Sequence, residues 1–317
     1  MDQGKPKAKL TKPEKVIGPN EGFNPGVEAN LDTQYIMGVG RDVPSVFYST
    51  AGQQPGSPEN EPFAKWLSIL ANTSDTDLPL TISTSYGDNE NTVVRSYAER
   101  VNVEFQKLGL RGTSIMFSSG DGGVAGGQAT RCDKFIPTFP AASIYVTAVG
   151  GTTGSSPETA ARFSSGGFSN YWARPSYQDE GVQAYLNSTS IVLPDSDRFN
   201  ASGAGFPDVS AQAENFAVVE SGFATPVDGT SCSSPAFTAV ISLVNEARLA
   251  AGKSSLGYLN QIIWKRFGPG GVFNDITTGS NPGCGTEGFP ATKGWSPVTG
   301  WGTPSYTRLV NAALELP

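Results

Sequence analysis

Apolar residues along this chain form two kinds of pattern that alternate from one end to the other. Short β-rich runs predict strands at 46–48, 80–83, 114–117, 144–149 and 216–219. Apolar residues at helical spacing predict helices at 27–37, 61–70, 92–108 and 235–251. Strands and helices that alternate in this way predict an α/β fold, with a parallel sheet covered by helices on both faces.

The 317 residues are enough for one large domain or two small ones. No internal repeat or second domain is visible, so residues 25–317 are expected to fold as one domain, in which 151–167 and 183–205 are polar loops. Residues 1–24 are expected to be a basic, disordered lead, because the first fifteen contain five Lys and no apolar run. The 38 Gly and 23 Pro indicate many tight turns.

Charge and hydropathy argue against two classes of partner. The formal charge of −7 disfavours nucleic acid, which is bound through basic patches. No run of about 18 apolar residues is present, so no membrane span is expected. Three glycosylation acceptors, at Asn72, Asn187 and Asn200, favour a glycoprotein that is secreted or held in a lysosome-like acidic compartment. No signal peptide is visible, so the chain is expected to be a fragment or a processed form.

Three Cys are present, without a CxxC motif or a Cys/His cluster that would indicate zinc. Cys132 and Cys284 lie in glycine-rich, loop-like surroundings, whereas Cys232 lies at the start of an apolar helix. We expect a Cys132–Cys284 disulfide, with Cys232 free and buried. Three free thiols are the alternative, because a sequence does not fix the connectivity of its cysteines.

The chain contains no His, and this changes how Ser231 is interpreted. Ser231 precedes the predicted helix 235–251, with Pro235 expected in the first turn. A helix N-terminus offers unpaired N–H groups and the positive end of the dipole, where an oxyanion would be stabilised. A serine nucleophile here would need a carboxylate base, and such chemistry belongs in acid. The alternative is that Ser231 is only the N-cap residue.

Glu28 and Asp32 lie one turn apart on one face of the predicted helix 27–37. Like charges at that spacing weaken a helix slightly, so helix stability does not explain the pair. Paired carboxylates can share a proton and titrate as a unit. Glu28 and Asp32 are therefore candidates for the missing base, and a solvated acidic face is the alternative interpretation.

Asp121 lies in a glycine-rich segment directly after the predicted strand 114–117. The carboxyl ends of parallel strands are where α/β proteins place site residues, so Asp121 is a candidate site acid. A turn-capping Asp is the alternative. Oxygen donors in 274–277 and 294–300 would suit calcium, although ordinary turns explain these segments equally well.

Together these segments resemble the sedolisin family of serine-carboxyl peptidases, and most closely its tripeptidyl-peptidase branch. The resemblance covers about residues 25–317, in the family's order. The segments that carry it are 28–35 (EANLDTQY), 85–88 (SYGD), 118–121 (SSGD), 166–170 (GGFSN), 174–178 (RPSYQ), 206–209 (FPDV), 229–231 (GTS) and 294–304 (GWSPVTGWGTP).

The resemblance implies a subtilisin-like fold and a Ser-Glu-Asp catalytic set. Ser231 would attack the peptide carbonyl to form an acyl-enzyme. Glu28 would be the general base and then the acid for the leaving amine, while Asp32 would orient and tune Glu28. Asp121 would be protonated and would donate a hydrogen bond to the oxyanion, which again requires acid.

Two departures from the family pattern follow. The family's calcium site would fall on Asp275 and on the carbonyls of Ile276 and Gly294, but Ser296 stands where a second Asp is expected. Calcium is thus an expected cofactor with a weakened site. The family's prosegment and the N-terminal part of its peptidase domain have no counterpart here. That part contributes sheet and cleft wall, so an exposed sheet edge is expected.

The expected function is that of an acid-acting serine peptidase that cleaves polypeptides and releases tripeptides from free N-termini. An endopeptidase of the same family is one alternative. A homologue that binds peptides without cleaving them is the other, and the truncation favours it.

Overall fold

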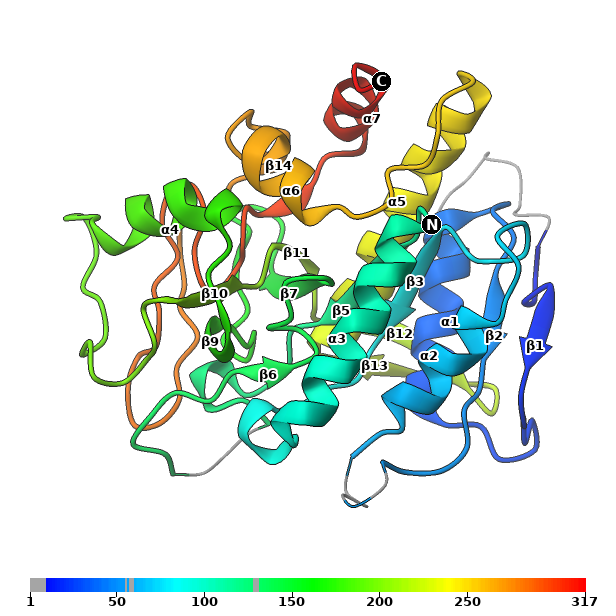
Figure 1. The fold of residues 1–317 in the computed structure, drawn as a ribbon, viewed down its shortest axis with the longest axis horizontal. Helices are drawn as coiled ribbons and strands as arrows, with labels where there is room; N and C mark the ends of the chain where they lie inside the picture. Colours follow the sequence, from blue (N-terminus) through cyan, green and yellow to red (C-terminus); the bar gives the residue numbers. More distant parts are fainter. Residues whose placement is uncertain (1–9, 55, 57–59, 128–130) are drawn as a thin grey trace.

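The computed structural model describes residues 10–54, 56, 60–127 and 131–317 (Figure 1). The helices are α1 (Val27–Gly40), α2 (Phe63–Ala71), α3 (Arg95–Leu110), α4 (Asp179–Leu186), α5 (Thr230–Ala250), α6 (Asn260–Ile262) and α7 (Tyr306–Leu314), with a π-helical turn at Ile263–Phe267 and 3-10 turns at Glu90–Thr92, Gly123–Ala125 and Ser176–Gln178. The strands are β1 (Lys15–Ile17), β2 (Val46–Tyr48), β3 (Thr81–Thr84), β4 (Asp88–Asn89), β5 (Ser114–Ser118), β6 (Thr138–Phe139), β7 (Thr147–Thr153), β8 (Thr159–Ala160), β9 (Gly167–Ala173), β10 (Gly203–Phe206), β11 (Val209–Gln212), β12 (Phe216–Glu220), β13 (Phe223–Val227), β14 (Phe273–Asn274) and β15 (Thr303–Pro304).

The central sheet has the strand order β11-β7-β5-β3, and all three pairings are parallel. Ile82 lies opposite Ile115, and Phe117 lies opposite Ala148. β8 adds an antiparallel pairing to the end of β7. The predicted parallel sheet flanked by helices is therefore confirmed.

The two faces of the sheet are covered by different helices, as the alternation of side chains along β5 requires. Met116 packs in the core that contains Phe237 and Ile241 of α5. Its neighbours Ile115 and Phe117 point to the other face, into the core formed with α2 and α3. All three β5 side chains are at most 3% exposed, as expected for a strand buried on both faces.

α5 is the central helix of the fold and packs against the sheet, α1 and α7. It begins at Thr230, so the prediction that the helix starts near Pro235 was wrong, and Pro235 lies inside it. Proline has no N–H to donate to the carbonyl four residues earlier, which is that of Ser231. The Ser85 hydroxyl lies 3.3 Å from that carbonyl, and its single proton is shared with the closer Oδ1 of Asp32, 2.7 Å away. This contact replaces the lost helical hydrogen bond only in part.

Several other sequence predictions also differ from the structure. The run at 216–219 is part of an antiparallel hairpin, β12–β13, rather than of the central sheet. β2 pairs with β1, which lies in the segment expected to be disordered, while residues 1–9 lie outside the described residues. The expected polar loops contain the end of β7, β8 and parts of α4 and β10. In each case partners distant in sequence decide the structure, and a local pattern does not record them.

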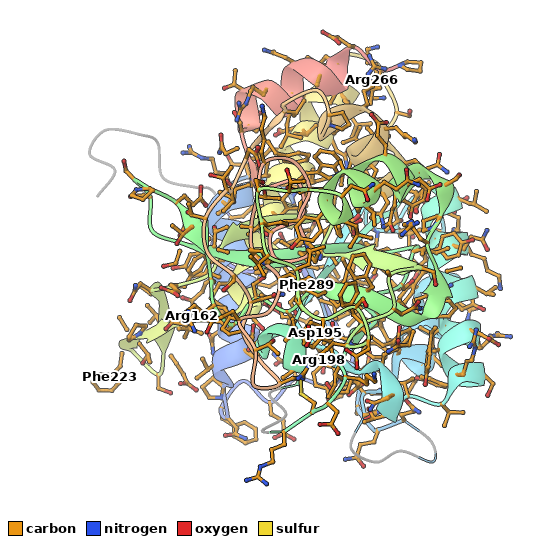
Figure 2. The ribbon with its side chains drawn as sticks, turned by 90° about the vertical axis from the view of Figure 1, so that its left-hand side faces the viewer. Arg162, Asp195, Arg198, Phe223, Arg266 and Phe289 are labelled. Atoms are coloured by element: carbon orange, nitrogen blue, oxygen red, sulfur yellow. A yellow bond between two sulfur atoms is a disulfide. The ribbon has the colours of Figure 1, made fainter. Side chains whose placement is uncertain are left out.

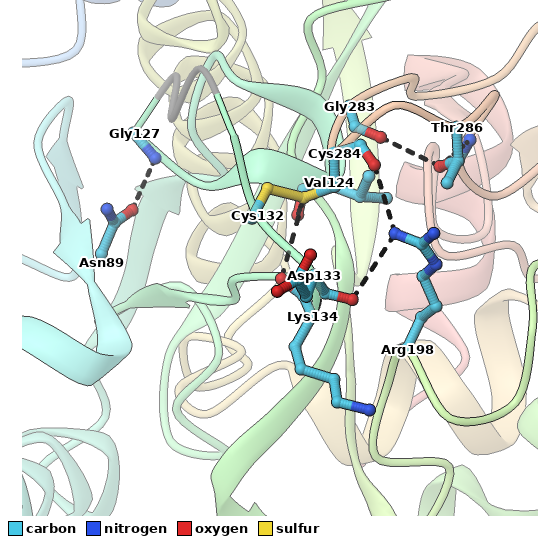
Figure 3. Close-up of a disulfide and its surroundings, with 11 residues drawn as sticks. Asn89, Val124, Gly127, Cys132, Asp133, Lys134, Arg198, Gly283, Cys284 and Thr286 are labelled. Atoms are coloured by element: carbon cyan, nitrogen blue, oxygen red, sulfur yellow. Dashed lines mark hydrogen bonds between the residues drawn. A yellow bond between two sulfur atoms is a disulfide. The ribbon is translucent and has the colours of Figure 1, made fainter.

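The predicted disulfide between Cys132 and Cys284 is confirmed, and Cys232 is free and buried as expected (Figure 3). The bridge joins loops 152 residues apart. Arg198 reinforces it, because Nη1 donates to the Cys284 carbonyl at 3.2 Å. The loops around the site are therefore cross-linked covalently.

Figure 2 labels two phenylalanines in opposite surroundings, Phe289 and Phe223. Phe289 is fully buried among Phe135, Phe168 and Phe199, whereas Phe223, at the tip of the β12–β13 hairpin, is 77% exposed and points away from the molecule. Over the described ranges, every helix is too short or too polar to cross a bilayer.

Candidate active site

α1 brings the two predicted carboxylates to the N-terminus of α5. Leu31, fully buried between α5 and the β12–β13 hairpin, fixes the helix in place by packing against Cys232 and Val218. Glu28 and Asp32 precede and follow Leu31, one turn apart, and both line the same cavity. The packing of Leu31 therefore fixes the part of α1 that carries both carboxylates.

Glu28 interacts directly with the candidate nucleophile. Loss of hydration raises the pKa of Glu28, the hydrogen bond with the Ser231 side chain lowers it, and the negative charge of Asp121 raises it further. The net effect is a pKa above the usual value. Because Glu28 still lies at the open edge of the site, it remains accessible to a substrate or to water.

Asp32 lies deeper than Glu28. Burial raises the pKa of Asp32 to about 7, the Ser85 hydrogen bond lowers it, and the charge of Glu28 raises it. The Ser85 hydroxyl donates to Oδ1 of Asp32 at 2.7 Å. In acid Asp32 is therefore protonated, and its charge does not compete with that of Glu28.

Asp121 follows β5 through the turn at Gly120 and reaches the first turn of α5. Its Oδ1 accepts from the Thr230 N–H at 2.7 Å and from the Thr230 hydroxyl at 2.8 Å. The Thr230 hydroxyl in turn accepts from the Gly120 N–H at 3.0 Å. Gly229, which directly precedes α5, has a φ of +152°, and a Cβ there would lie 3.1 Å from Oδ2 of Asp121. Only glycine fits this close approach without strain.

The structure thus brings Glu28, Asp32, Asp121 and Ser231 together around the N-terminus of α5. Sequence reasoning assigned no role to Ser85 and Thr230, which hold Asp32 and Asp121. The available signal was their position: Ser85 directly follows β3, and Thr230 precedes the nucleophile. The carboxyl ends of parallel strands are where such supporting residues are to be sought.

Of the predicted calcium ligands, Asp275 and Gly294 lie in contact with each other. Both carboxylate oxygens of Asp275 accept from the Gly294 N–H, at 3.1 and 3.2 Å. Burial raises the pKa of Asp275, and the N–H of Gly294 and the charge of Lys293 lower it. Ser296 is fully buried, and its hydroxyl bonds to that of Thr299 at 3.0 Å. No group of three or more His, Cys, Asp or Glu that could hold a metal occurs in the described residues. One carboxylate beside a lysine does not fit a tight calcium site.

Comparison with known proteins shows extensive similarity. Over 312 residues, 95% of this chain, it is 42% identical to tripeptidyl-peptidase 1 of Homo sapiens and 41% identical to that of Mus musculus. The match covers 54% of each of these proteins, so the chain spans about half the length of the curated relatives it matches. No family model matches the chain.

Among solved structures, Pseudomonas sedolisin, a serine-carboxyl proteinase complexed with two molecules of pseudo-iodotyrostatin, aligns with a TM-score of 0.76. The alignment covers 95% of this chain and 84% of sedolisin, at 21% identity. This likeness shows the fold. With the sequence matches, it confirms the resemblance to the sedolisin family.

Proposed function

From its 42% identity to tripeptidyl-peptidase 1 along 95% of its length, we propose that this chain is the catalytic part of an acid-acting serine-carboxyl peptidase that releases tripeptides from free N-termini. One observation carries the proposal. In a chain without histidine, the Glu28 carboxyl lies close enough to the Ser231 side chain, at a helix N-terminus, for their hydrogen bonding to lower the pKa of Glu28. That contact is the nucleophile–base pair that acyl transfer requires.

The first half of the reaction makes the acyl-enzyme. Ionised Glu28 takes the hydroxyl proton of Ser231 while Oγ of Ser231 forms a bond to the substrate carbonyl carbon. Negative charge then develops on the carbonyl oxygen, where the Ser231 N–H and a protonated Asp121 would donate to it. The carbon–nitrogen bond breaks as Glu28 returns the proton to the leaving amine.

The second half reverses these roles with water. Glu28 deprotonates a water molecule that attacks the acyl carbon, and the proton passes to Ser231 Oγ as the ester bond breaks. Protonated Asp32 donates to Glu28 in both halves, which keeps that carboxylate oriented. The reaction needs Glu28 ionised while Asp32 is protonated, so we place its optimum in acid.

A labelling experiment tests the proposal. A fluorophosphonate-type serine probe at pH ~4, where a carboxylate base is partly ionised, should label the folded chain and fail to label Ser231→Ala. Labelling restricted to other residues, or none in folded protein, would favour a homologue that binds peptides without cleaving them.

Exopeptidase and endopeptidase action are separated by one comparison. A peptide with a free N-terminus and its N-acetylated form should be cleaved at very different rates if the enzyme releases tripeptides. Equal rates on both would favour the endopeptidase alternative.

Two further features of the proposal follow from the site and the surface. We propose that the Asp275 loop binds calcium weakly, because one carboxylate and two backbone carbonyls are its donors.

An acidic, lysosome-like or extracellular location would suit the chemistry. Asn187 is exposed and could accept a glycan there. Asn72 is exposed too, but its amide donates to the Ser68 carbonyl at 2.7 Å, as that of Asn200 donates to the Ser169 carbonyl at 2.9 Å.

A further inference from the structure

Arg162, in the loop between β8 and β9, is an exposed cation without a partner. Within the described part of the chain its side chain forms no hydrogen bond and no ion pair. Arg95 and Arg174, by contrast, pair with Glu99 and Asp179 at 3.0 and 2.9 Å. The guanidinium of Arg162 therefore keeps its whole fork of N–H donors for water or a ligand.

The residue before Arg162 lies beside the first turn of α5. The Ala161 N–H donates to the Gly151 carbonyl of β7 at 3.0 Å. A Cβ on Gly151 would lie 3.4 Å from Cβ of Ala161 and also 3.4 Å from Cγ2 of Thr230. Ala161 and Thr230 therefore flank the same glycine. Arg162 follows Ala161 directly, just as Ser231 follows Thr230.

The residue after Arg162 is tied to the turn that carries Asp121. The Phe163 carbonyl accepts from the N–H of Gly123, two residues after Asp121, at 2.8 Å. Backbone contacts thus hold Arg162 between the start of α5 and this turn, on the side of the molecule from which the β12–β13 hairpin projects (Figure 2). An extended peptide advances about 3.4 Å per residue, so Arg162 is within reach of only the few substrate residues beside the scissile bond.

Carboxylates close to these segments in the chain have other donors. Oε1 of Glu158, four residues before Arg162, accepts from the Thr152 hydroxyl at 2.6 Å. Oδ1 of Asp228, which lies just before α5, accepts from the Asn215 N–H at 2.7 Å. The charge of Arg162 is therefore not neutralised within the described chain. A carboxylate is the ligand that a guanidinium matches best, through two parallel hydrogen bonds.

The charge of Arg162 also indicates which part of a substrate it contacts. Under the proposed function, on which this inference rests, the acyl part is a tripeptide that begins with an α-ammonium group, and a cation repels that group. The departing part carries side-chain carboxylates and ends in an α-carboxylate. We propose that Arg162 binds a carboxylate within the first residues after the scissile bond, and that the enzyme therefore favours substrates with Asp or Glu there.

Peptide binding to the Ser231→Ala chain tests the proposal without turnover. The peptides share a free N-terminus and an amidated C-terminus, and they carry either Asp or Asn at the fourth or fifth residue, directly after the bond expected to be cleaved. At pH ~5 an Asp side chain is largely ionised. The better Asp peptide should then bind about fivefold more tightly than its Asn counterpart, as for a favourable exposed charge pair. Asp at the third residue, before the bond, should give no such preference.

Two further comparisons identify the carboxylate and its mode of binding. An Asn peptide of six residues with a free instead of an amidated C-terminus shows whether a terminal carboxylate serves as well as a side chain. The Asp preference should shrink toward one in about 1 M NaCl, because salt screens an exposed charge pair.

Substitutions made in the Ser231→Ala chain localise the preference. Arg162→Gln should bring the Asp-to-Asn affinity ratio to about one, whereas Arg162→Lys keeps the charge and should retain a ratio of at least about two. Arg266→Gln removes the same charge from the turn at the top of Figure 2, where Arg266 lies 3.7 Å from Glu315, and should keep the parent's ratio.

Three results would overturn the proposal: no binding by any peptide, equal binding of Asp and Asn peptides, or the same ratio in Arg162→Gln as in its parent. A preference for Asp only at the third residue would also overturn it. Hydrolysis of the Asn peptides by the chain that retains Ser231 tests the proposed function separately.

Discussion

Thr230 and Asp121 are joined by two hydrogen bonds that converge on a single oxygen, Oδ1 of the carboxyl group. The Thr230 hydroxyl also accepts from the Gly120 N–H, which ties the turn after β5 to the start of α5. With Oδ1 held in this way, the proton that Asp121 must donate to an oxyanion would sit on Oδ2. Thr230 is therefore a positioning residue for Asp121.

Thr230→Val should lower kcat by about 10- to 100-fold with little change in KM, because the oxyanion donor loses its alignment. Thr230→Ser keeps the hydroxyl and should restore most of the rate. Steady-state kinetics of both variants across the acid range is the measurement. A loss of rate in Thr230→Ser with none in Thr230→Val would mean that the methyl packing, rather than the hydrogen bond, matters.

Replacing Asp32 by Asn should lower the activity far less than replacing it by Ala. With its pKa raised to about 7 by burial, Asp32 is neutral at pH ~4, so Asp32→Asn mimics the form we assign to it. The Asn Oδ1 can still accept from Ser85. We expect kcat/KM of Asp32→Asn within about tenfold of the parent at pH ~4, and a loss of at least about 100-fold in Asp32→Ala.

The pH profile gives a second readout of Asp32. An amide cannot ionise, so the part of the alkaline limb that Asp32 contributes should disappear in Asp32→Asn. An alkaline limb identical to that of the parent would contradict the protonated role.

Stability should fall as the pH rises from about 4 to 7. Burial is the main cause that raises the pKa values of Asp32, Glu90 and Asp208 to about 7 and that of Asp88 to about 6. A carboxyl group whose pKa is higher in the folded than in the unfolded chain stabilises the folded state. This contribution is complete below the pKa of the unfolded chain and is lost as the pH rises through the pKa of the folded chain. Urea unfolding at pH 4 and pH 7 measures the difference.

Asp88→Asn isolates one of these groups. Oδ2 of Asp88 is buried without a hydrogen-bond partner, and the hydrogen bond from Tyr86 to this carboxyl does not offset the cost of burying its charge. The variant should unfold with about 1–3 kcal/mol more free energy than the parent at pH 7, and with nearly the same free energy at pH 4. Glu99→Gln, on the exposed face of α3, is the control. A difference that does not depend on pH would count against the buried-charge explanation.

Calcium binding should depend on the residue at position 296. Chelation by EGTA should shift the Tm of the parent chain by no more than a few degrees, since a single carboxylate serves the loop. Ser296→Asp supplies the second carboxylate and should make Tm rise with added calcium. Ser296→Ala controls for loss of the Thr299 hydrogen bond. If EGTA unfolds the parent chain, the weak site is refuted.

The sequence predicted the fold class, the helix that carries Glu28 and the Cys132–Cys284 bridge. These depend on local spacing or on a resemblance spread over the chain. The antiparallel partner of β12 could not be predicted, because an apolar run looks the same in a hairpin and in a parallel sheet. The same limit hid the pairing of β1 with β2.

The start of α5 shows a second limit of sequence reasoning. Pro235 marks a helix boundary by its lack of an N–H, yet the helix begins at Thr230. The lost hydrogen bond is partly replaced by the hydroxyl of Ser85, 146 residues before Ser231 in the chain, and no local rule records this contact. The roles of Ser85 and Thr230 were missed for the same reason, since both act through partners distant in sequence.

The central claim is that Glu28 manages the proton of Ser231, and a profile of kcat/KM against pH for the parent and for Glu28→Gln tests it most directly. The parent should have a bell-shaped profile with its maximum in acid, and Glu28→Gln should lose about 1,000-fold at that maximum while remaining folded. A parent that is fastest in alkali, or a Glu28→Gln variant that keeps the parent's rate, would contradict the account.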